Sequence, residues 1–221
     1  MNKPVLVIGS GGHASVVLEA LALQSQYSVV GLLDSFQPAG SEKHGFPILG
    51  SPERVAELAA AYCCHSFFVA VGDNWFRDQI SSMIRDVVAN AEFITAIHPA
   101  ACISRSASVG PGSIALAGAV IGVNARIAEG CILNTSCSVD HDCQLQAFSS
   151  VGPGAHIGGN VVVSARSAVG IGATLREKIL VGADTVIGAG AAVVSDLPEH
   201  VVAFGVPARV VRQRTKGEKY I

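Results

Sequence analysis

The segment best suited to chemistry is Asp140-His141-Asp142, in a chain of which only 14% is charged. A histidine between two carboxylates is oriented by them, and its pKa rises because they stabilise the protonated ring. Such a group could take the proton from an amine or hydroxyl that attacks an acyl carbonyl. The alternative is a solvated corner with ordinary polar residues. We favour the catalytic interpretation, with His141 as general base and Asp142 as the acid beside it.

A second candidate site is the turn Gly9-Ser10-Gly11-Gly12-His13-Ala14, which satisfies G-x-G-x-x-A between a strand-like and a helix-like segment. Such a turn presents backbone N–H groups and a helix N-terminus to phosphate. Asp34 ends the second strand-like segment, about where a ribose-binding acid would sit. Three interpretations stay open: nucleotide or nucleotide-sugar binding, a dinucleotide redox site, and a turn that only packs strand against helix. Because only about 97 residues precede the repeats described below, a half-Rossmann unit holding one nucleotide is the most economical.

A metal site is not expected. His141 and His156 are 15 residues apart rather than 18, so they do not stack, and about 10 Å should separate them. Cys131, Cys137 and Cys143 are six apart at a small inward position. A buried Cys₃ metal site is conceivable there, but small apolar packing is the more common role.

The elements that must position these residues follow from an internal repeat of six. From Ile103 to Val193, fifteen of the sixteen residues met in steps of six are Ile, Leu or Val, and Ala115 is the exception. Three residues after each of them, Gly, Asn or Asp occurs in eleven of sixteen repeats. These residue types tolerate positive φ and suit a tight corner. The unit is therefore a short strand plus a corner, which predicts a parallel β-helix over about residues 103–198.

The first part of the chain alternates strand-like and helix-like segments, which predicts a small parallel α/β domain. Strands are expected at 5–9, 28–34, 47–49, 67–71 and 93–97, and helices at 14–24, 51–61 and 75–88. His98-Pro99 ends this region. We therefore divide the chain into an α/β nucleotide-sugar-binding domain, 1–97, and a β-helix acyltransferase domain with a C-terminal tail, 98–221.

Composition excludes several classes of protein. The formal net charge is −2 with no long run of one sign, so nucleic acid is not an expected partner. The N-terminus does not resemble a signal peptide, and no uninterrupted run of about 18 apolar residues suggests a membrane span. Without a secretion signal, the six cysteines should stay reduced, and a cytoplasmic location is expected.

Together these residues resemble the hexapeptide-repeat sugar acyltransferases, a family that includes the bacillosamine-pathway and perosamine N-acetyltransferases and the sialic acid O-acetyltransferase group. The resemblance covers nearly the whole chain. It rests on Gly11-Gly12-His13, Leu33-Asp34, Val71-Gly72-Asp73-Asn74, Ile97-His98-Pro99, Asn134-Thr135-Ser136, the Asp-His-Asp centre and Gly205-Val206-Pro207-Ala208. The last motif is widespread, whereas the first together with the Asp-His-Asp centre is specific.

The resemblance implies a left-handed coil of three sides and 18 residues, a homotrimer with the site between subunits, and a setting in polysaccharide biosynthesis. It implies that His141 is the general base and that Asp142 raises its basicity. The residues implied to bind the sugar nucleotide are Gly11, Gly12, His13, Asp34, Ser35, Gly72 and Asn134. The residues implied to contact CoA are Ser150, Ile171 and Ala189, with the Gly159 N–H near the acetyl carbonyl. Members often carry a histidine where this chain has Ser150, which cannot serve as a second base.

The prediction is therefore an acetyl-CoA-dependent N-acetyltransferase acting on a nucleotide-linked 4-amino sugar, with no metal or redox cofactor. A phosphate-binding turn would be wasted on a substrate without phosphate, which favours this acceptor over a sialic acid hydroxyl. Three alternatives remain. The first is an O-acetyltransferase that acts on sialic acid, and the second is a zinc enzyme like the γ-carbonic anhydrases. The third is a nucleotide-sensing or scaffold protein with a degenerate site.

Overall fold

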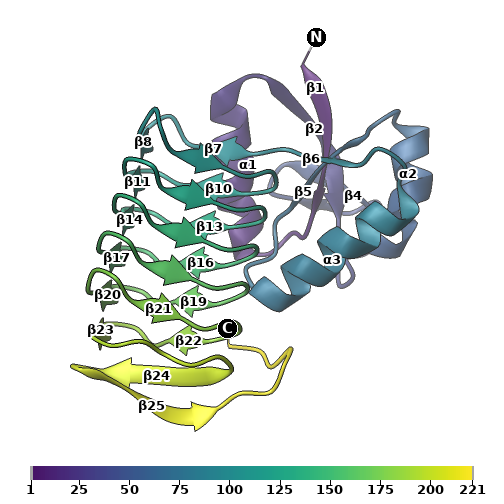
Figure 1. Ribbon diagram of the computed structural model, residues 1–221. Helices are drawn as coiled ribbons and strands as arrows, with labels where there is room; N and C mark the ends of the chain where they lie inside the picture. Colours follow the sequence, from purple (N-terminus) through teal and green to yellow (C-terminus); the bar gives the residue numbers. More distant parts are fainter. Residues whose placement is uncertain (1, 221) are drawn as a thin grey trace.

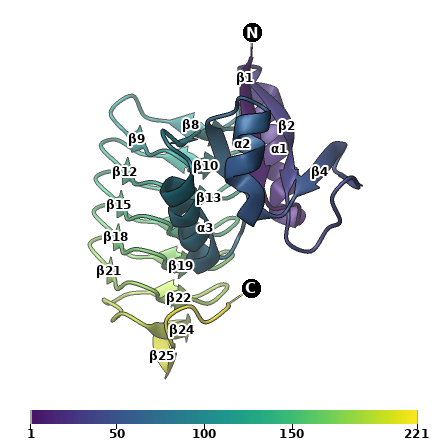
Figure 2. The same ribbon diagram turned by 90° about the vertical axis from the view of Figure 1, so that its right-hand side faces the viewer.

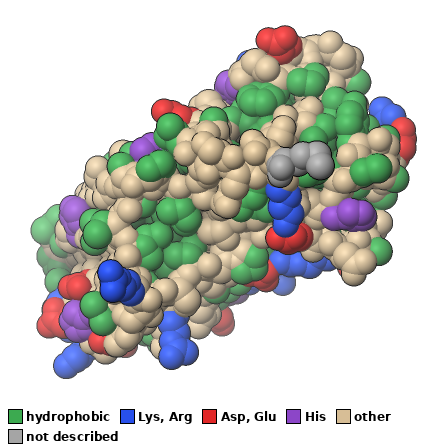
Figure 3. All heavy atoms as spheres, turned by 90° about the horizontal axis from the view of Figure 1, so that it is seen from above, with side chains coloured by type: hydrophobic (Ala, Val, Ile, Leu, Met, Phe, Trp, Pro, Cys, Tyr) green, Lys and Arg blue, Asp and Glu red, His purple; other side chains and the backbone are tan. Residues whose placement is uncertain are grey.

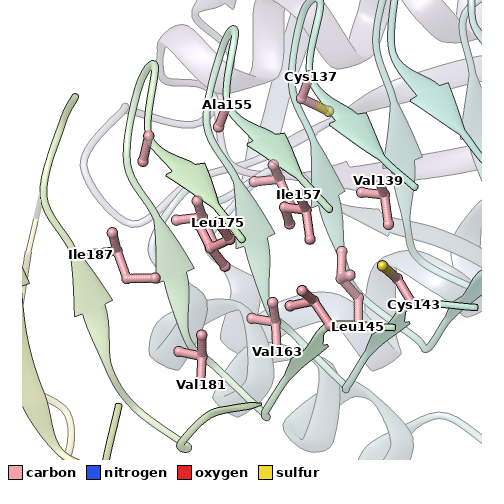
Figure 4. Packing of buried hydrophobic residues seen from close by; sticks show 14 of the residues in the cluster. Cys137, Val139, Cys143, Leu145, Ala155, Ile157, Val163, Leu175, Val181 and Ile187 are labelled. Carbon is pink, nitrogen blue, oxygen red and sulfur yellow. The ribbon is translucent and has the colours of Figure 1, made fainter. Parts of the chain in front are cut away.

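The aliphatic residues that recur every six positions lie inside a triangular coil, beside which an α/β domain packs (Figure 1). The structure is a computed structural model that describes residues 2–220. Figure 4 shows Val139, Leu145, Ile157 and Val163 stacked within the coil. Cys137 and Cys143 point into the same core, as predicted.

The α/β domain contains a sheet of order β3-β4-β2-β1-β5-β6, in which only β3 and β4 pair antiparallel. Its elements are β1 (Lys3–Ile8), α1 (Gly12–Gln24), β2 (Tyr27–Leu33), β3 (Glu42–Lys43), β4 (Phe46–Gly50), a 3₁₀ turn (Pro52–Arg54), α2 (Val55–Ala61), β5 (Ser66–Val69), α3 (Asn74–Val87) and β6 (Glu92–Phe93). The predicted alternation of strand and helix is confirmed, with bounds that differ by a few residues.

Each turn of the coil has three two-residue strands, and equivalent strands of successive turns pair in parallel 18 residues apart. Face 1 consists of β7 (Ala96–Ile97), β10 (Ile114–Ala115), β13 (Ile132–Leu133), β16 (Ser150–Val151), β19 (Ala168–Val169) and β22 (Val186–Ile187), continued by β24 (Val201–Gly205) and β25 (Ala208–Gln213). Face 2 consists of β8 (Cys102–Ile103), β11 (Val120–Ile121), β14 (Ser138–Val139), β17 (His156–Ile157), β20 (Thr174–Leu175) and β23 (Ala192–Val193). Face 3 consists of β9 (Ser108–Val109), β12 (Arg126–Ile127), β15 (Gln144–Leu145), β18 (Val162–Val163) and β21 (Leu180–Val181).

The corners of the coil use positive φ where the repeat predicts it. Asn124, Asp142 and Asn160 have φ of 57°, 57° and 60°. Asp and Asn tolerate this region better than other non-glycine residues. Larger residues also adopt it, among them Phe148 at 59°. The backbone of the coil therefore imposes the corner even where the side chain does not favour it.

The prediction of one strand over 93–97 was wrong, because this segment is shared between two sheets. Phe93 in β6 pairs with Phe67 of β5, whereas Ala96 in β7 pairs with Ile114 of face 1. The coil thus begins one strand before the predicted first repeat. Ile97 keeps the six-residue phase of Ile103, so the signal was present in the sequence.

The domains share a core. Val17 and Leu21 of α1 lie in one cluster of buried residues with Ile114 and Ile132 of face 1. Helix α3 lies along the coil in both ribbon views (Figures 1 and 2). The division at residue 97 stays a prediction, and β7 lies on its N-terminal side while pairing within the coil.

Among residues 2–220, no helix has both the length and the apolar character that a bilayer crossing requires. In the view from above, Figure 3 shows charged side chains scattered among hydrophobic and uncharged surface.

Candidate functional site

The corner between faces 2 and 3 presents His141 between its two acidic neighbours. The Nδ1 atom of His141 lies 2.9 Å from Asp142 Oδ2, and the His141 backbone N–H donates to Asp140 Oδ1 at 2.7 Å. Asn124, one turn below Asp142, donates to its other carboxylate oxygen at 3.1 Å. The hydrogen bond to Asp142, helped by the charge of Asp140, holds the pKa of His141 above its ordinary value. The imidazole is about half exposed and points out of the coil, as predicted.

Gly159 stands one turn above His141 at the same corner. A Cβ on this glycine would lie 2.5 Å from His141 Nε2 and 2.6 Å from Cε1, so the ring occupies the space that any side chain would need. Within residues 2–220, the Gly159 backbone N–H donates to no recorded acceptor. The structure therefore brings together the predicted base and the predicted oxyanion donor.

The glycine turn after β1 is built as the sequence predicts. Gly9 has φ of +105°, and a Cβ there would lie 2.8 Å from the Ala70 carbonyl oxygen. Gly11 and Gly12 face open space at the start of α1, whose first turn receives no side-chain cap. Both residues are exposed and their backbone N–H groups have no hydrogen-bond acceptor among residues 2–220, so an anion could accept from them.

Asp34 holds this turn from the end of β2. Its carboxylate accepts hydrogen bonds from the Ser10 N–H at 2.9 Å and the Ser10 hydroxyl at 2.7 Å, and from the N–H groups of Phe36 and Gln37. Burial alone would raise the pKa of Asp34, but these hydrogen bonds outweigh it and hold the pKa below its usual value. Asp34 thus shapes the turn, and its contact with a ribose stays a prediction.

A cavity of about 610 Å³ lies at the carboxyl ends of β1, β2 and β5, and three predicted residues line it: Asp34, Ser35 and Gly72. We call it the nucleotide cavity, after the ligand predicted for these residues. Most of its other walls are apolar, including Phe36 and Phe76. A flat aromatic base fits such walls, and ligands of open α/β sheets bind at this edge.

A second hollow, which we call the groove, runs along face 1 and the corner between faces 1 and 2 and has a volume of about 360 Å³. It gathers the three predicted CoA contacts, Ser150, Ile171 and Ala189, together with His13 and Asn134. Gly72 borders both hollows. The sequence thus identified residues that are far apart in the chain but close in the fold.

His13 is half-buried at the groove. Burial, with the positive charge of Arg77 nearby, lowers its pKa from 6.5 to about 4, so its ring is neutral at pH 7. Its Nε2 atom is buried and has no hydrogen-bond partner among residues 2–220. A buried polar atom without a partner is costly, which suits a group that binds a ligand.

The structure also reveals two residues to which no role was assigned from sequence. Arg77 of α3 is 1% exposed and donates to the carbonyl oxygens of Val71, Gly72, Gly130 and Phe148 and to Asn74 Oδ1. Asn74 is fully buried, and its amide donates to Ser150 Oγ at 3.1 Å. The predicted helix over 75–88 contains two arginines, Arg77 and Arg85, and nothing in the sequence marks Arg77 as the buried one.

One chain does not bring all the predicted residues together. His141, Asp142 and Gly159 lie at the corner between faces 2 and 3, whereas the groove lies at face 1 and the corner between faces 1 and 2. Face 2 separates these two regions of the coil.

No set of three His, Cys, Asp or Glu side chains in residues 2–220 is arranged to hold a metal ion. His156 instead places Nδ1 2.8 Å from Ser138 Oγ on face 2. Burial raises the pKa of the Cys137 thiol to about 12, which keeps it neutral within the coil core.

Comparison with known proteins shows which proteins this chain is related to. The family described as "PglD N-terminal domain" matches residues 4–84. The chain is 36% identical over 116 residues to the UDP-N-acetylbacillosamine N-acetyltransferase of Bacillus subtilis (strain 168), and this alignment spans 52% of each protein. It is 28% identical over 163 residues to the GDP-perosamine N-acetyltransferase of Escherichia coli O157:H7, spanning 71% of each.

Solved structures extend the match to almost the entire chain. PerB from Caulobacter crescentus, in complex with CoA and GDP-perosamine, is 36% identical with a TM-score of 0.87, covering 94% of this chain and 96% of PerB. The acetyltransferase domain of PglB from Neisseria gonorrhoeae FA1090, in complex with acetyl coenzyme A, is 35% identical with a TM-score of 0.86, covering 96% of this chain and all of that domain. Their shared architecture confirms the predicted Rossmann-like domain and left-handed β-helix. The chain belongs to the PglD/PerB family of sugar acyltransferases, together with the bacillosamine and perosamine N-acetyltransferases.

Proposed function

We propose that this protein transfers the acetyl group of acetyl-CoA to the amine of a 4-amino sugar linked to a nucleotide. The observation that carries the proposal is the His141 corner. With Nδ1 hydrogen-bonded to Asp142 at 2.9 Å, the neutral ring holds its proton on Nδ1 and keeps a lone pair on Nε2. That lone pair lies beside Gly159, where the acyl carbonyl would sit.

The transfer needs one proton acceptor and no covalent enzyme intermediate. The sugar amine attacks the thioester carbon while His141 Nε2 takes a proton from the nitrogen. The Gly159 N–H donates a hydrogen bond to the oxyanion of the tetrahedral intermediate. As that intermediate collapses, the C–S bond breaks, and the imidazolium returns its proton to the CoA thiolate. The amide and free CoA are the products.

The two hollows support this pair of substrates. The apolar walls of the nucleotide cavity suit a base, and the N–H groups of Gly11 and Gly12, which have no acceptor among residues 2–220, suit a diphosphate. The groove suits a narrow, mostly apolar chain such as pantetheine, and exposed Ile171 lies on it. Among relatives, PerB is described with both CoA and GDP-perosamine, and also as H141A and H141N mutants with these ligands.

The separation of the two corners supports a homotrimer. In a threefold assembly of parallel coils, the corner of one subunit that holds His141 would face the groove of its neighbour. The site would then lie between subunits. Light scattering of the purified protein tests this, with a mass of three chains expected.

The deciding experiment measures thiol release from acetyl-CoA with a panel of UDP- and GDP-linked 4-amino sugars. We expect turnover with one of them and a loss of about 100-fold or more in His141→Ala. His65→Ala is the matched control, because His65 is exposed and belongs to the α/β domain rather than to the coil corner that holds His141.

Other outcomes would select the alternatives. Turnover only with sialic acid acceptors would favour O-acetylation. Stoichiometric zinc in the purified protein, with CO₂ hydration, would favour the carbonic-anhydrase-like enzyme. Unchanged activity in His141→Ala would reject general-base catalysis by this residue.

A further inference from the structure

The segment after β25, residues 214–220, is called the tail here. It turns back from the last strand toward the α/β domain, and its end lies close to face 1 in both ribbon views (Figures 1 and 2). The Arg214 guanidinium donates to the Asp184 carbonyl oxygen at 2.7 Å. Glu218 forms an ion pair with Arg212 at 2.6 Å, which closes the tail onto β25.

The tail then contacts the first turn of α3. The Lys216 ammonium lies 5.1 Å from the ring centroid of Trp75, and Gly217 packs against the same indole. The Lys219 ammonium lies 5.4 Å from the ring centroid of Phe76. Such cation–π contacts are individually modest, but two of them hold consecutive parts of the tail on the same helical turn.

Tyr220 continues the tail into the groove. Its hydroxyl accepts a hydrogen bond from the Asn74 N–H at 3.3 Å, and it lines the groove with His13 and Ser150. Burial raises the pKa of Tyr220, so the hydroxyl stays protonated at neutral pH. Tyr220 therefore adds a polar group beside Ser150.

Lys219 lies on the other hollow. It lines the nucleotide cavity, whose remaining charged walls are Asp34, Glu53 and Asp73. Lys219 is thus the sole cation among the described residues that line this cavity. The diphosphate of a nucleotide sugar carries two negative charges, which three carboxylates would repel without a compensating cation.

We infer that the tail is a wall shared by the two substrate hollows, in which the Lys219 ammonium binds the diphosphate of the nucleotide sugar and Tyr220 anchors the tail at the groove. Consecutive residues thereby border the nucleotide cavity and the groove. This inference rests on the proposed function and adds a specificity residue to it. Lys219 contributes to the affinity for the nucleotide sugar and takes no part in the proton transfer at His141.

Calorimetric titration of the full-length protein with GDP, UDP and dTDP tests the inference. We expect Lys219→Ala to weaken the tightest-binding diphosphate about 10-fold, the scale of one charge-assisted hydrogen bond. Lys219→Arg should restore most of the affinity because it keeps the charge. Lys216→Ala is the matched control, since it removes a tail cation that lines neither hollow. Raising the salt concentration should weaken native binding more than binding by Lys219→Ala.

The outcomes separate the two proposals. If the native protein binds a diphosphate and Lys219→Ala binds it within twofold of native, the inference is wrong and the proposed function stands. If the native protein binds none of the three diphosphates, the proposed function fails and the inference falls with it. Melting temperatures of all variants should agree with the native value, because Lys219 is exposed.

Discussion

His141 Nε2 lies 2.5 Å from the place where Gly159 would carry a Cβ, so the base and the residue one turn above it share a single small space. Residues 18 apart stack directly in this coil, as the β14–β17 pairing shows for its neighbours. The repeat therefore places Gly159 directly against the His141 ring. Only a residue without a side chain leaves the ring in its observed position.

Gly159→Ala should lower kcat by about 10-fold or more, because the added methyl group displaces the imidazole from its working position. The free energy of unfolding should change little, since the ring is exposed and can move aside. The measurement is a double-mutant cycle with His141→Ala. In that background the alanine at 159 should cost nothing further, and a full additional loss would contradict the steric account.

Asp142→Asn should change the pH profile of kcat/KM. His141 must be neutral to act as base, so activity rises as pH rises through its pKa. Because the hydrogen bond to Asp142 raises that pKa, its removal should move the acidic limb to lower pH. The plateau should fall about 10-fold or more, since the ring loses both orientation and basicity. Asp86→Asn, an exposed carboxylate of α3, is the control and should leave the limb in place. A limb that moves to higher pH would contradict the assignment.

His13→Gln should reduce the loss of stability on mild acidification. In the folded protein the His13 pKa is about 4, whereas in the unfolded chain it is near 6.5. Between these values the unfolded state binds the proton and the folded state does not, so stability falls as pH drops from 6.5 toward 4. Urea unfolding at pH 7 and pH 5 should show the native protein losing about 2 kcal/mol more than the variant. Exposed His65→Gln is the control, and equal pH dependence of the native and His13→Gln proteins would show that His13 titrates normally.

Arg77→Ala should destabilise the protein by about 3 kcal/mol or more, because it leaves several buried carbonyl oxygens of both domains without donors. Arg85→Ala is a matched control on the same helix. Arg85 also reaches the coil, through an ion pair with Glu129, but those side chains are 38% and 35% exposed and so screened by solvent. Its loss should cost less than about 1 kcal/mol in urea unfolding. Equal losses in the two variants would mean that burial adds nothing to the Arg77 contacts.

The sequence determined the coil because a repeat of six specifies inward residues, corners and register together. Each repeat places an aliphatic residue at the same inward position, and no insertion interrupts the repeat from Ile103 to Val193. The neighbours His141 and Asp142 were equally readable, since they are adjacent in the chain and the corner turns both outward. The segment 93–97 was not readable, because short apolar stretches suit either sheet.

The family resemblance named His13 and Ser150, but only the tertiary structure showed that they meet Asn74 and Tyr220 at the groove. His13, Asn74, Ser150 and Tyr220 come from four distant parts of the chain, and neither repeat nor spacing relates them. Arg77 owes its role to carbonyl groups of two domains, which have no sequence signature because every residue carries one. A periodic pattern fixes contacts within its own repeat, whereas contacts between a repeat and another domain depend on how the folded surfaces meet.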